Sequence, residues 1–399
     1  MKYIVIIPDG AADEQLESRD DKTIFELAAT PTMDLMAREG RLGLARTVPD
    51  GLKPGSDVAN LSLLGYDPAQ VLSGRAALEA ASMNVEVPEG DAVFRANLVT
   101  VSDEGIMEDY SAGHISTEEG QALIELLNQD MSIDGVTLFP GVGYRHLCLI
   151  ENAGAGIPDR APPHEIIGES IGDYMPQGQF SSWVLEVEHA CEELLPNYEI
   201  NLLRLGEDKN PANRIWLWGG ATAMKLDNFA AKYGLGSAGL ISAVDLMRGI
   251  GTLAGMDVLT VEGATAYLDT NFAGKGRAAL DYIYEHDFVC VHVEAPDEAG
   301  HNGDIDGKVK SLEDIDKHIV APLYAMAKYY GDWRILLAPD HPTPVSSGKH
   351  SATPVPYVVW GPGFEANGAK AFNEKEAERV DDQAIVGASL MDVLMAQNG

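Results

Sequence analysis

Three short apolar segments of this chain end in the same dipeptide, Pro-Asp, and this repeated ending constrains the fold more than any other feature. The segments are IVIIPD, which closes at Asp9, VHVEAPD, at Asp297, and ILLAPD, at Asp340. Each has the length and the apolar character of a buried strand. In open α/β sheets, sites are built at the carboxyl ends of the strands, so we expect the three carboxylates to meet at one edge. One Pro-Asp alone would indicate only a turn.

Strand-like and helical patterns alternate towards both ends of the sequence. Further apolar runs lie at 239–243 and 257–261, and helical patterns lie at 276–285 and 311–330. Such alternation predicts a mostly parallel sheet flanked by helices, so the expected fold class is α/β.

The middle of the sequence has a different pattern. From about residue 80 to residue 212, segments such as FRANLVTVSDEG and GYRHLCLIE alternate apolar and polar residues. This alternation is typical of antiparallel strands with one exposed face. We therefore expect a smaller α+β domain at 80–212, inserted into a discontinuous α/β domain that comprises 1–79 and 213–399.

The composition excludes several classes of partner. The 399 residues include 62 Asp and Glu against 28 Lys and Arg, a formal net charge of −34, so nucleic acid and anionic membranes would be repelled. Cys148, Cys191 and Cys290 lie far apart without CxxC spacing, which indicates buried thiols in a reducing compartment. The apolar run at the N-terminus is too short for a signal peptide or a membrane span, so we expect a cytoplasmic protein.

Histidines follow two of the three Pro-Asp endings. His301 lies four residues after Asp297, His341 directly follows Asp340, and His350 comes nine residues after His341. Carboxylate oxygens together with imidazole nitrogens suit Mn, Zn, Fe, Co or Mg. A catalytic ion usually takes about three protein ligands and keeps one position open, so three aspartates and three histidines favour two ions.

A candidate nucleophile lies in KPGSDVANLSLLGYDP, where Ser56 is predicted to be the N-cap of a short helix that Gly65 stops. Ser56 could be only a cap. The helix N-terminus would also attract a phosphate, and a cation on the hydroxyl would make it a nucleophile, so the two roles are compatible. By contrast, GLGSAG at 234–239 matches a dinucleotide-binding fingerprint in letters only, because a helical pattern precedes it and an apolar run follows.

These residues, in this order, resemble the cofactor-independent, or 2,3-bisphosphoglycerate-independent, phosphoglycerate mutases of the alkaline phosphatase superfamily, in particular their archaeal-type branch. The similarity runs over nearly the whole chain, through segments such as IIPDGAAD, TVPDGLKPGSDVANLSLLGYDP, EAPDEAGHNGD and APDHPTPVSSGKHSATPVP. The resemblance implies an alkaline phosphatase-like core that binds metal and catalyses the reaction. It implies an inserted domain that binds substrate and acts as a lid.

The resemblance also implies the roles of individual residues. Ser56 would be the nucleophile. The implied ligands of one ion are Asp297, His301 and His350, and those of the other are Asp9, Ser56, Asp340 and His341. The candidates for substrate binding are His114, Arg145, Arg75, Arg95 and Lys275.

The implied reaction is the interconversion of 3-phosphoglycerate and 2-phosphoglycerate through a phosphoserine, in glycolysis and gluconeogenesis. The cofactors would be two divalent ions (Mn, Zn, Co or Mg), without 2,3-bisphosphoglycerate. The partner would be a small phosphorylated carboxylate, and the oligomeric state stays open. Another phosphoryl transfer on the same core, by a homoserine kinase or a phosphomonoesterase, is the alternative, because either enzyme would need the same metal site.

Overall fold

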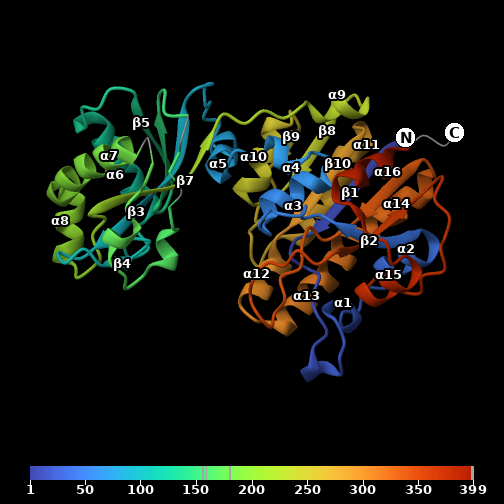
Figure 1. Ribbon diagram of the computed structural model, residues 1–399. Coiled ribbons are helices and arrows are strands. Elements are labelled where there is room, and N and C mark those ends of the chain that lie inside the picture. Colours follow the sequence, from blue (N-terminus) through green and yellow to red (C-terminus); the bar gives the residue numbers. More distant parts are fainter. Residues whose placement is uncertain (155–156, 159, 179–180, 397–399) are drawn as a thin grey trace. The chain divides into compact units, whose positions relative to one another are not determined.

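A computed structural model of the chain describes residues 1–154, 157–158, 160–178 and 181–396 (Figure 1). The chain divides into two compact units, Met1–Leu72 with Lys225–Gly399, and Ser73–Met224. The second unit extends beyond the expected 80–212 at both ends. Its helix α5 (Arg75–Ser82) packs on strands of its own sheet, and its strand β7 (Arg214–Thr222) runs past the expected end.

Within the described residues, the first unit contains an eight-stranded sheet of order β13-β2-β12-β11-β1-β10-β8-β9. Its parallel part consists of β11 (Trp333–Leu337), β1 (Lys2–Pro8), β10 (Phe288–Val293), β8 (Ala238–Ile241) and β9 (Asp257–Leu259). These five strands coincide with the apolar runs of the sequence. The remaining strands are β12 (Val355–Trp360) and β2 (Arg41–Arg46), paired antiparallel, and β13 (Ile385–Val386), parallel to β2. The α/β fold class is confirmed.

Helices flank this sheet (Figure 1). In chain order, the helices before residue 260 are η1 (Glu17–Arg19), α1 (Ile24–Leu27), α2 (Pro31–Glu39), α3 (Ser56–Leu63), α4 (Pro68–Val71), α9 (Phe229–Tyr233) and α10 (Asp245–Leu253). The helices after residue 260 are α11 (Phe272–Glu285), α12 (Ala295–His301), α13 (Ile305–Ile315), the π-helical η5 (Asp316–Val320), α14 (Ala321–Tyr330), α15 (Glu374–Val380), η6 (Gly387–Ser389) and α16 (Leu390–Met395). Both predicted helical segments, 276–285 and 311–330, lie within helices.

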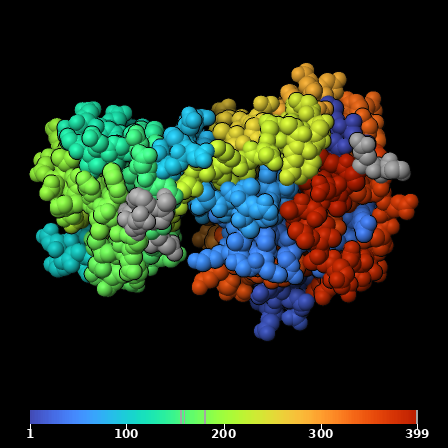
Figure 2. Space-filling view, turned by 45° about the horizontal axis from the view of Figure 1, so that its top comes forward, coloured from blue at the N-terminus to red at the C-terminus, as the bar shows by residue number. Residues whose placement is uncertain are grey.

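Distant parts of the sequence lie side by side in the first unit. Helix α3 packs on η6, and a Cβ built on Gly387 would lie 3.3 Å from Ser62 Cβ. Figure 2 shows this face, where blue N-terminal and red C-terminal segments adjoin. The GLGSAG segment joins α9 to β8, so a helix precedes it and a strand follows, the reverse of a dinucleotide-binding turn.

The second unit is built on an antiparallel sheet that, among the described residues, has five strands. These are β3 (Ala92–Val101), β4 (Met107–Asp109), β5 (Val136–Val142), β6 (Arg145–Ile150) and β7. The helices are α5, α6 (Thr117–Asp130), η2 (Pro163–Glu165), η3 (Ile171–Tyr174), α7 (Ser181–Leu194), η4 (Leu195–Asn197) and α8 (Glu199–Gly206). Phe94, Ala96 and Leu98 pack with α6 and α7, so the period of two along β3 turns Arg95 to the opposite face. The expected α+β organisation is confirmed.

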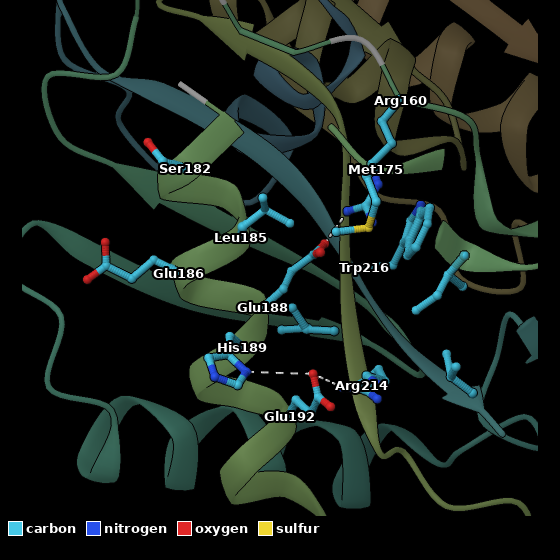
Figure 3. Close-up of a pocket in the computed structure, with 13 residues that line it drawn as sticks. Arg160, Met175, Ser182, Leu185, Glu186, Glu188, His189, Glu192, Arg214 and Trp216 are labelled. Atoms are coloured by element: carbon cyan, nitrogen blue, oxygen red, sulfur yellow. Dashed lines mark hydrogen bonds and ion pairs between the residues drawn. The ribbon is translucent and has the colours of Figure 1, made fainter. Parts of the chain in front are cut away.

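Helix α7 and strand β7 contribute most of the residues that line an open pocket of about 460 Å³ in this unit (Figure 3). The Arg160 guanidinium lies 3.3 Å from the centroid of the Trp216 ring and pairs with Glu188. Arg214 pairs with Glu192 on the same helix. Among the described residues that line the pocket, none was a candidate site residue.

Two further expectations concern the chain as a whole. Among the described residues, no helix combines the length and the apolar character needed to cross a bilayer. Cys148, Cys191 and Cys290 are buried, and each is a free thiol, as the sequence predicted.

Candidate metal centre and active site

The carboxyl edge of the parallel sheet carries the three predicted aspartates. Strand β1 lies between β10 and β11, and Asp9 directly follows it. Asp340 lies in the loop after β11. Asp297 differs from the prediction of a strand end, because it lies in the first turn of α12, which begins just after β10. The helix places His301 one turn further on, on the same face.

Gly10 allows the loop after β1 to approach α12. Its φ of +60° lies in the left-handed region, and a Cβ built on it would lie 2.7 Å from the Cα of Asp297. Its N–H donates to Asp340 Oδ1 at 3.0 Å. A side chain at position 10 would therefore separate elements that carry candidate ligands.

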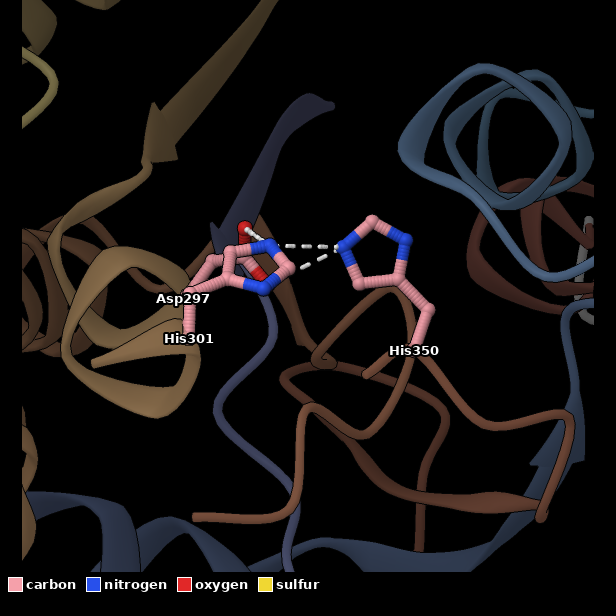
Figure 4. A group of neighbouring side chains, drawn as sticks. All are labelled: Asp297, His301 and His350. Atoms are coloured by element: carbon pink, nitrogen blue, oxygen red, sulfur yellow. Dashed lines mark hydrogen bonds and ion pairs between the residues drawn. The ribbon is translucent and has the colours of Figure 1, made fainter. Parts of the chain in front are cut away.

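Asp297, His301 and His350 form the first ligand group (Figure 4). The Nε2 atom of His301 lies 3.0 Å from Asp297 Oδ2 and 3.0 Å from His350 Nε2. His350 Nε2 lies 3.6 Å from Asp297 Oδ1. His301 Nδ1 donates to the carbonyl of Gly348 at 2.9 Å. In a neutral His301 the Nε2 atom therefore has a lone pair, and this lone pair faces the acceptor atoms of Asp297 and His350. Acceptors that converge in this way need a proton or a cation between them.

Asp9, Asp340 and His341 form the second ligand group, and all three are fully buried. His341 Nε2 lies 3.5 Å from Asp9 Oδ1, 3.4 Å from Asp340 Oδ2 and 3.2 Å from the Ser56 hydroxyl oxygen. The Thr343 hydroxyl donates to Asp297 Oδ1 and lies 3.2 Å from His341 Nδ1. It must therefore accept from Nδ1–H, which leaves the lone pair of His341 on Nε2.

The charges of the second group call for a cation. Burial raises the pKa of Asp9, and the nearby carboxylates of Asp340, Glu294 and Asp297 raise it further. Asp9 Oδ1 is buried and has no hydrogen-bond partner among the described residues. A divalent ion would offset both the repulsion and the missing bond. The residues of both groups therefore fit divalent ions that bind oxygen and nitrogen.

Ser56 is the first residue of α3, whereas the sequence predicted it as the N-cap. Gly55 is the N-cap, with extended backbone (φ −178°, ψ 155°). The Ser56 hydroxyl oxygen lies 3.2 Å from His341 Nε2. The side chain of Asn60, one turn further, donates to Ser56 O at 2.9 Å and to Asp340 Oδ2 at 2.8 Å. Asn60 thus ties the helix to the second ligand group.

A buried ion pair holds the loops that carry the ligands. Lys308 of α13 is fully buried, and Nζ donates to Asp13 Oδ2 at 2.8 Å and to the carbonyl of Thr343 at 2.7 Å. Asp13 lies four residues after Asp9, and Thr343 lies two after His341. The Lys308 ammonium group therefore joins the loop after β1 to the loop after β11.

Lys275, an expected substrate contact, is a buried residue of α11. Its side chain is only 1% exposed, and its Nζ donates to the carbonyl of His292 at 3.2 Å. Burial lowers the pKa of Lys275 to about 8. The helical spacing of Phe272, Lys275 and Ala279 already places this lysine on the buried face of α11.

The sequence analysis did not select His292, Glu294 or Asn60. His292 and Glu294 belong to the VHVEAPD segment, two residues apart, and could have been found from the same strand-end signal. Burial lowers the pKa of His292 to about 3 and raises that of Glu294 to about 7. His292 Nε2 lies 2.7 Å from Asp9 Oδ2.

The candidate arginines cluster in the second unit. The Arg95 guanidinium lies 4.0 Å from the centroid of the Trp218 ring and 3.0 Å from Glu79. Burial lowers the pKa of Arg95, and the charges of Arg75 and Arg145 add to this effect, so the three cations lie near one another. The ring of His164, which the sequence analysis did not select, lies 5.9 Å from that of Trp218.

His114 lies in a turn between β4 and α6, with φ of +50°, and is exposed. Its N–H donates to the Ser111 hydroxyl at 3.1 Å. Among the described residues, no hydrogen bond, ion pair or ring contact joins His114 to the arginine cluster.

A mostly parallel sheet with an inserted α+β unit, and with carboxylates and imidazoles gathered at its carboxyl edge, defines an α/β protein with a candidate metal centre. The sequence model of the 2,3-bisphosphoglycerate-independent phosphoglycerate mutases matches residues 37–201. The chain is 47% identical over 399 residues to a probable 2,3-bisphosphoglycerate-independent phosphoglycerate mutase of Geobacter sulfurreducens, covering 99% of this chain and 100% of the relative. It is 45% identical over 397 residues to the 2,3-bisphosphoglycerate-independent phosphoglycerate mutase of Methanosarcina mazei, covering 99% and 100%. The chain therefore belongs to the 2,3-bisphosphoglycerate-independent phosphoglycerate mutase family.

Solved structures agree in fold. A protein from Pyrococcus horikoshii superposes with a TM-score of 0.83 at 26% identity, over 99% of this chain and 96% of that one. The cofactor-independent phosphoglycerate mutase of Thermoplasma acidophilum superposes with a TM-score of 0.70 at 23% identity, over 99% of both chains.

Proposed function

We propose that the chain is a metal-dependent isomerase that interconverts 3-phosphoglycerate and 2-phosphoglycerate through a phosphoserine at Ser56. The relatives named as phosphoglycerate mutases support this activity. The observation that carries the mechanism is the position of the Ser56 hydroxyl, 3.2 Å from the same His341 nitrogen that faces Asp9 and Asp340. At this position the hydroxyl would bind the same ion as the second ligand group. Ser56 is also the first residue of α3, where a phosphoryl group would meet free backbone N–H groups.

Two divalent ions, held by the first and second ligand groups, would neutralise phosphoryl oxygens and lower the pKa of the Ser56 hydroxyl. Ser56 Oγ loses its proton and attacks phosphorus in line, and the bond to the glycerate oxygen breaks, so that this oxygen leaves as an alkoxide and takes up a proton. Asn60 keeps Ser56 beside Asp340 during this step, because it bonds to both. The glycerate then presents its other hydroxyl oxygen, which takes the phosphoryl group from the phosphoserine. No 2,3-bisphosphoglycerate is needed.

The substrate is an anion, whereas the chain carries a net charge of −34. In our proposal the arginine cluster of the second unit, Arg75, Arg95 and Arg145, together with His114, holds the phosphorylated carboxylate. Burial of Arg95 strengthens its interaction with an anion, because water screens it less. The second unit would also act as a lid that excludes water until the glycerate has turned. The cytoplasm is the proposed compartment, which the three free thiols support.

The test is an assay of 2-phosphoglycerate formation from 3-phosphoglycerate with Mn, Zn, Co or Mg. We expect turnover with at least one ion, and a phosphorylated Ser56 peptide in enzyme quenched during turnover. The control variant Ser351→Ala removes a hydroxyl near His350 and should keep the activity. If no ion supports mutase turnover and the same protein phosphorylates homoserine from ATP, the proposed function is wrong and the kinase alternative replaces it.

A further inference from the structure

His292 makes a close contact with a candidate metal ligand although it belongs to neither ligand group. It lies in β10, is fully buried, and its Nε2 atom is 2.7 Å from Asp9 Oδ2. On the other side of the ring, Nδ1 lies 3.2 Å from the hydroxyl oxygen of Ser242. That oxygen also accepts from the N–H of Val244 at 3.1 Å. The ring is therefore fixed between two polar partners inside the protein.

The charge of Asp9 assigns the hydrogen on this ring. A nitrogen and a carboxylate oxygen 2.7 Å apart share a hydrogen, since two lone pairs at that separation would repel each other. An ionised Asp9, the form that binds a metal ion, has no hydrogen to give, so His292 donates from Nε2 to Asp9. Its Nδ1 is then the acceptor of a neutral ring, and the Ser242 hydroxyl donates to it. Lys275 holds the same residue through the carbonyl of His292.

His341 and a neutral His301 carry their hydrogen on the other nitrogen. His301 donates from Nδ1 to Gly348 O, and His341 donates from Nδ1 to the Thr343 hydroxyl. In these forms each ring points an Nε2 lone pair at a carboxylate, as a metal ligand does. His292 has the opposite tautomer, so it differs in kind from these two, although its Nε2 atom lies closer to an aspartate than theirs do.

Asp9, His292 and Glu294 also lie close enough to form a third ligand group, but their spacing argues against an ion there. Nitrogen and oxygen ligands bind Zn²⁺ at about 2.0 to 2.2 Å, which places two ligands about 3 Å or more from each other. The contact from His292 to Asp9 is shorter than this, at 2.7 Å, and His292 Nε2 lies 3.7 Å from Glu294 Oε2.

We propose that His292 is a positioning residue, which orients Asp9 for the ion of the second ligand group. By bonding to Oδ2, His292 fixes the rotation of the carboxylate and leaves Oδ1 turned towards His341. Oδ1 is the buried oxygen that has no partner among the described residues. The proposal rests on the proposed two-ion function and deepens it, because it assigns the group that orients a ligand.

The test measures binding of Mn²⁺, from the electron paramagnetic resonance of the free ion, in the wild type and in His292→Leu and His292→Gln. The leucine variant lacks the donor, so we expect about 10- to 100-fold weaker binding of one of two ions, as for other partners of metal ligands. The glutamine variant keeps an N–H at a similar reach and should bind nearly as the wild type does. The matched control is His146→Leu, which replaces a buried histidine of the second unit and should leave Mn²⁺ binding unchanged.

The outcomes separate this inference from the proposed function. A wild type that binds no Mn²⁺ tightly would contradict the function itself. Two ions bound by the wild type and, with equal affinity, by His292→Leu would contradict only the role of His292. A third ion in the wild type that both variants lose would make His292 a ligand and overturn the proposal.

If the His292→Leu variant does not fold, the tautomer of His292 in the wild type tests the proposal instead. ¹⁵N chemical shifts of the histidine rings in the metal-free wild type should show hydrogen on Nε2 of His292 and on Nδ1 of His341. Hydrogen on Nδ1 of His292 would contradict the proposal.

Discussion

Acidification should weaken metal binding at the first ligand group, because a proton competes with the ion for His301. In the metal-free protein, the hydrogen bond that His301 Nε2 donates to the Asp297 carboxylate raises the pKa of His301 to about 9, against an ordinary value of about 6.5. Below pH 9 the Nε2 atom of His301 therefore holds a proton, which an ion has to displace. The affinity of this group should rise with pH up to about 9 and then level off.

The size of the effect follows from that pKa. Two pH units below the pKa, about one imidazole in 100 is free of its proton. The side chain of His301 is 37% exposed, and solvent screens the ion pair, so we discount the effect to about 10- to 100-fold weaker binding at pH 7 than above pH 9. About one proton should be released for each ion bound at this group at pH 7.

Calorimetric titration with Mg²⁺ at pH 7, 8 and 9, in buffers of different ionisation enthalpy, measures both the affinity and the protons released. The variant His301→Gln should lose most of the pH dependence, since it has no titrating nitrogen. His189→Gln, which replaces an exposed histidine of the second unit, should retain it. An affinity that does not change between pH 7 and 9, without proton release, would refute the assignment of the proton to His301.

Three further variants test single contacts. Ser56→Ala should lower turnover by about 10⁴-fold or more while Mn²⁺ still binds. Steady-state assays measure the turnover, and full activity in this variant would exclude the phosphoserine. Gly10→Ala should cost at least about 1 kcal/mol of unfolding free energy, because φ is +60° and the Cβ would meet Asp297; urea denaturation that matches the wild type would contradict this. Lys308→Met leaves Asp13 buried and unpaired and should cost about 3 to 5 kcal/mol in the same measurement, whereas Lys310→Met, at a largely exposed lysine, should change little.

The parallel part of the sheet could be predicted because its strands are continuous apolar runs. A strand that is covered on both faces needs apolar residues at every position, and other strands do not. The antiparallel strands β2 and β12 were not recognised. β2 is short and bounded by Arg41 and Arg46, and it acquires its strand conformation from pairing with β12. Such pairing depends on distant residues and leaves a weak local pattern.

The candidate metal ligands could be selected because the three aspartates close apolar segments and the three histidines follow two of these segments, and the structure brings the same residues together in two groups. Their roles stay predictions. Asn60 was missed because it follows no strand end and its contact with Asp340 joins segments 280 residues apart. No local pattern distinguishes a buried asparagine that bonds to a distant aspartate from one at a helix surface.

The Thr343 hydroxyl makes the two ligand groups depend on each other. It has one hydrogen, which it gives to Asp297 of the first group while it accepts from His341 of the second. An ion held at His341 Nε2 would favour the tautomer that leaves this hydrogen free for Asp297, and so would keep the first carboxylate oriented. By linkage, an ion at the first group would favour the same tautomer by the same factor.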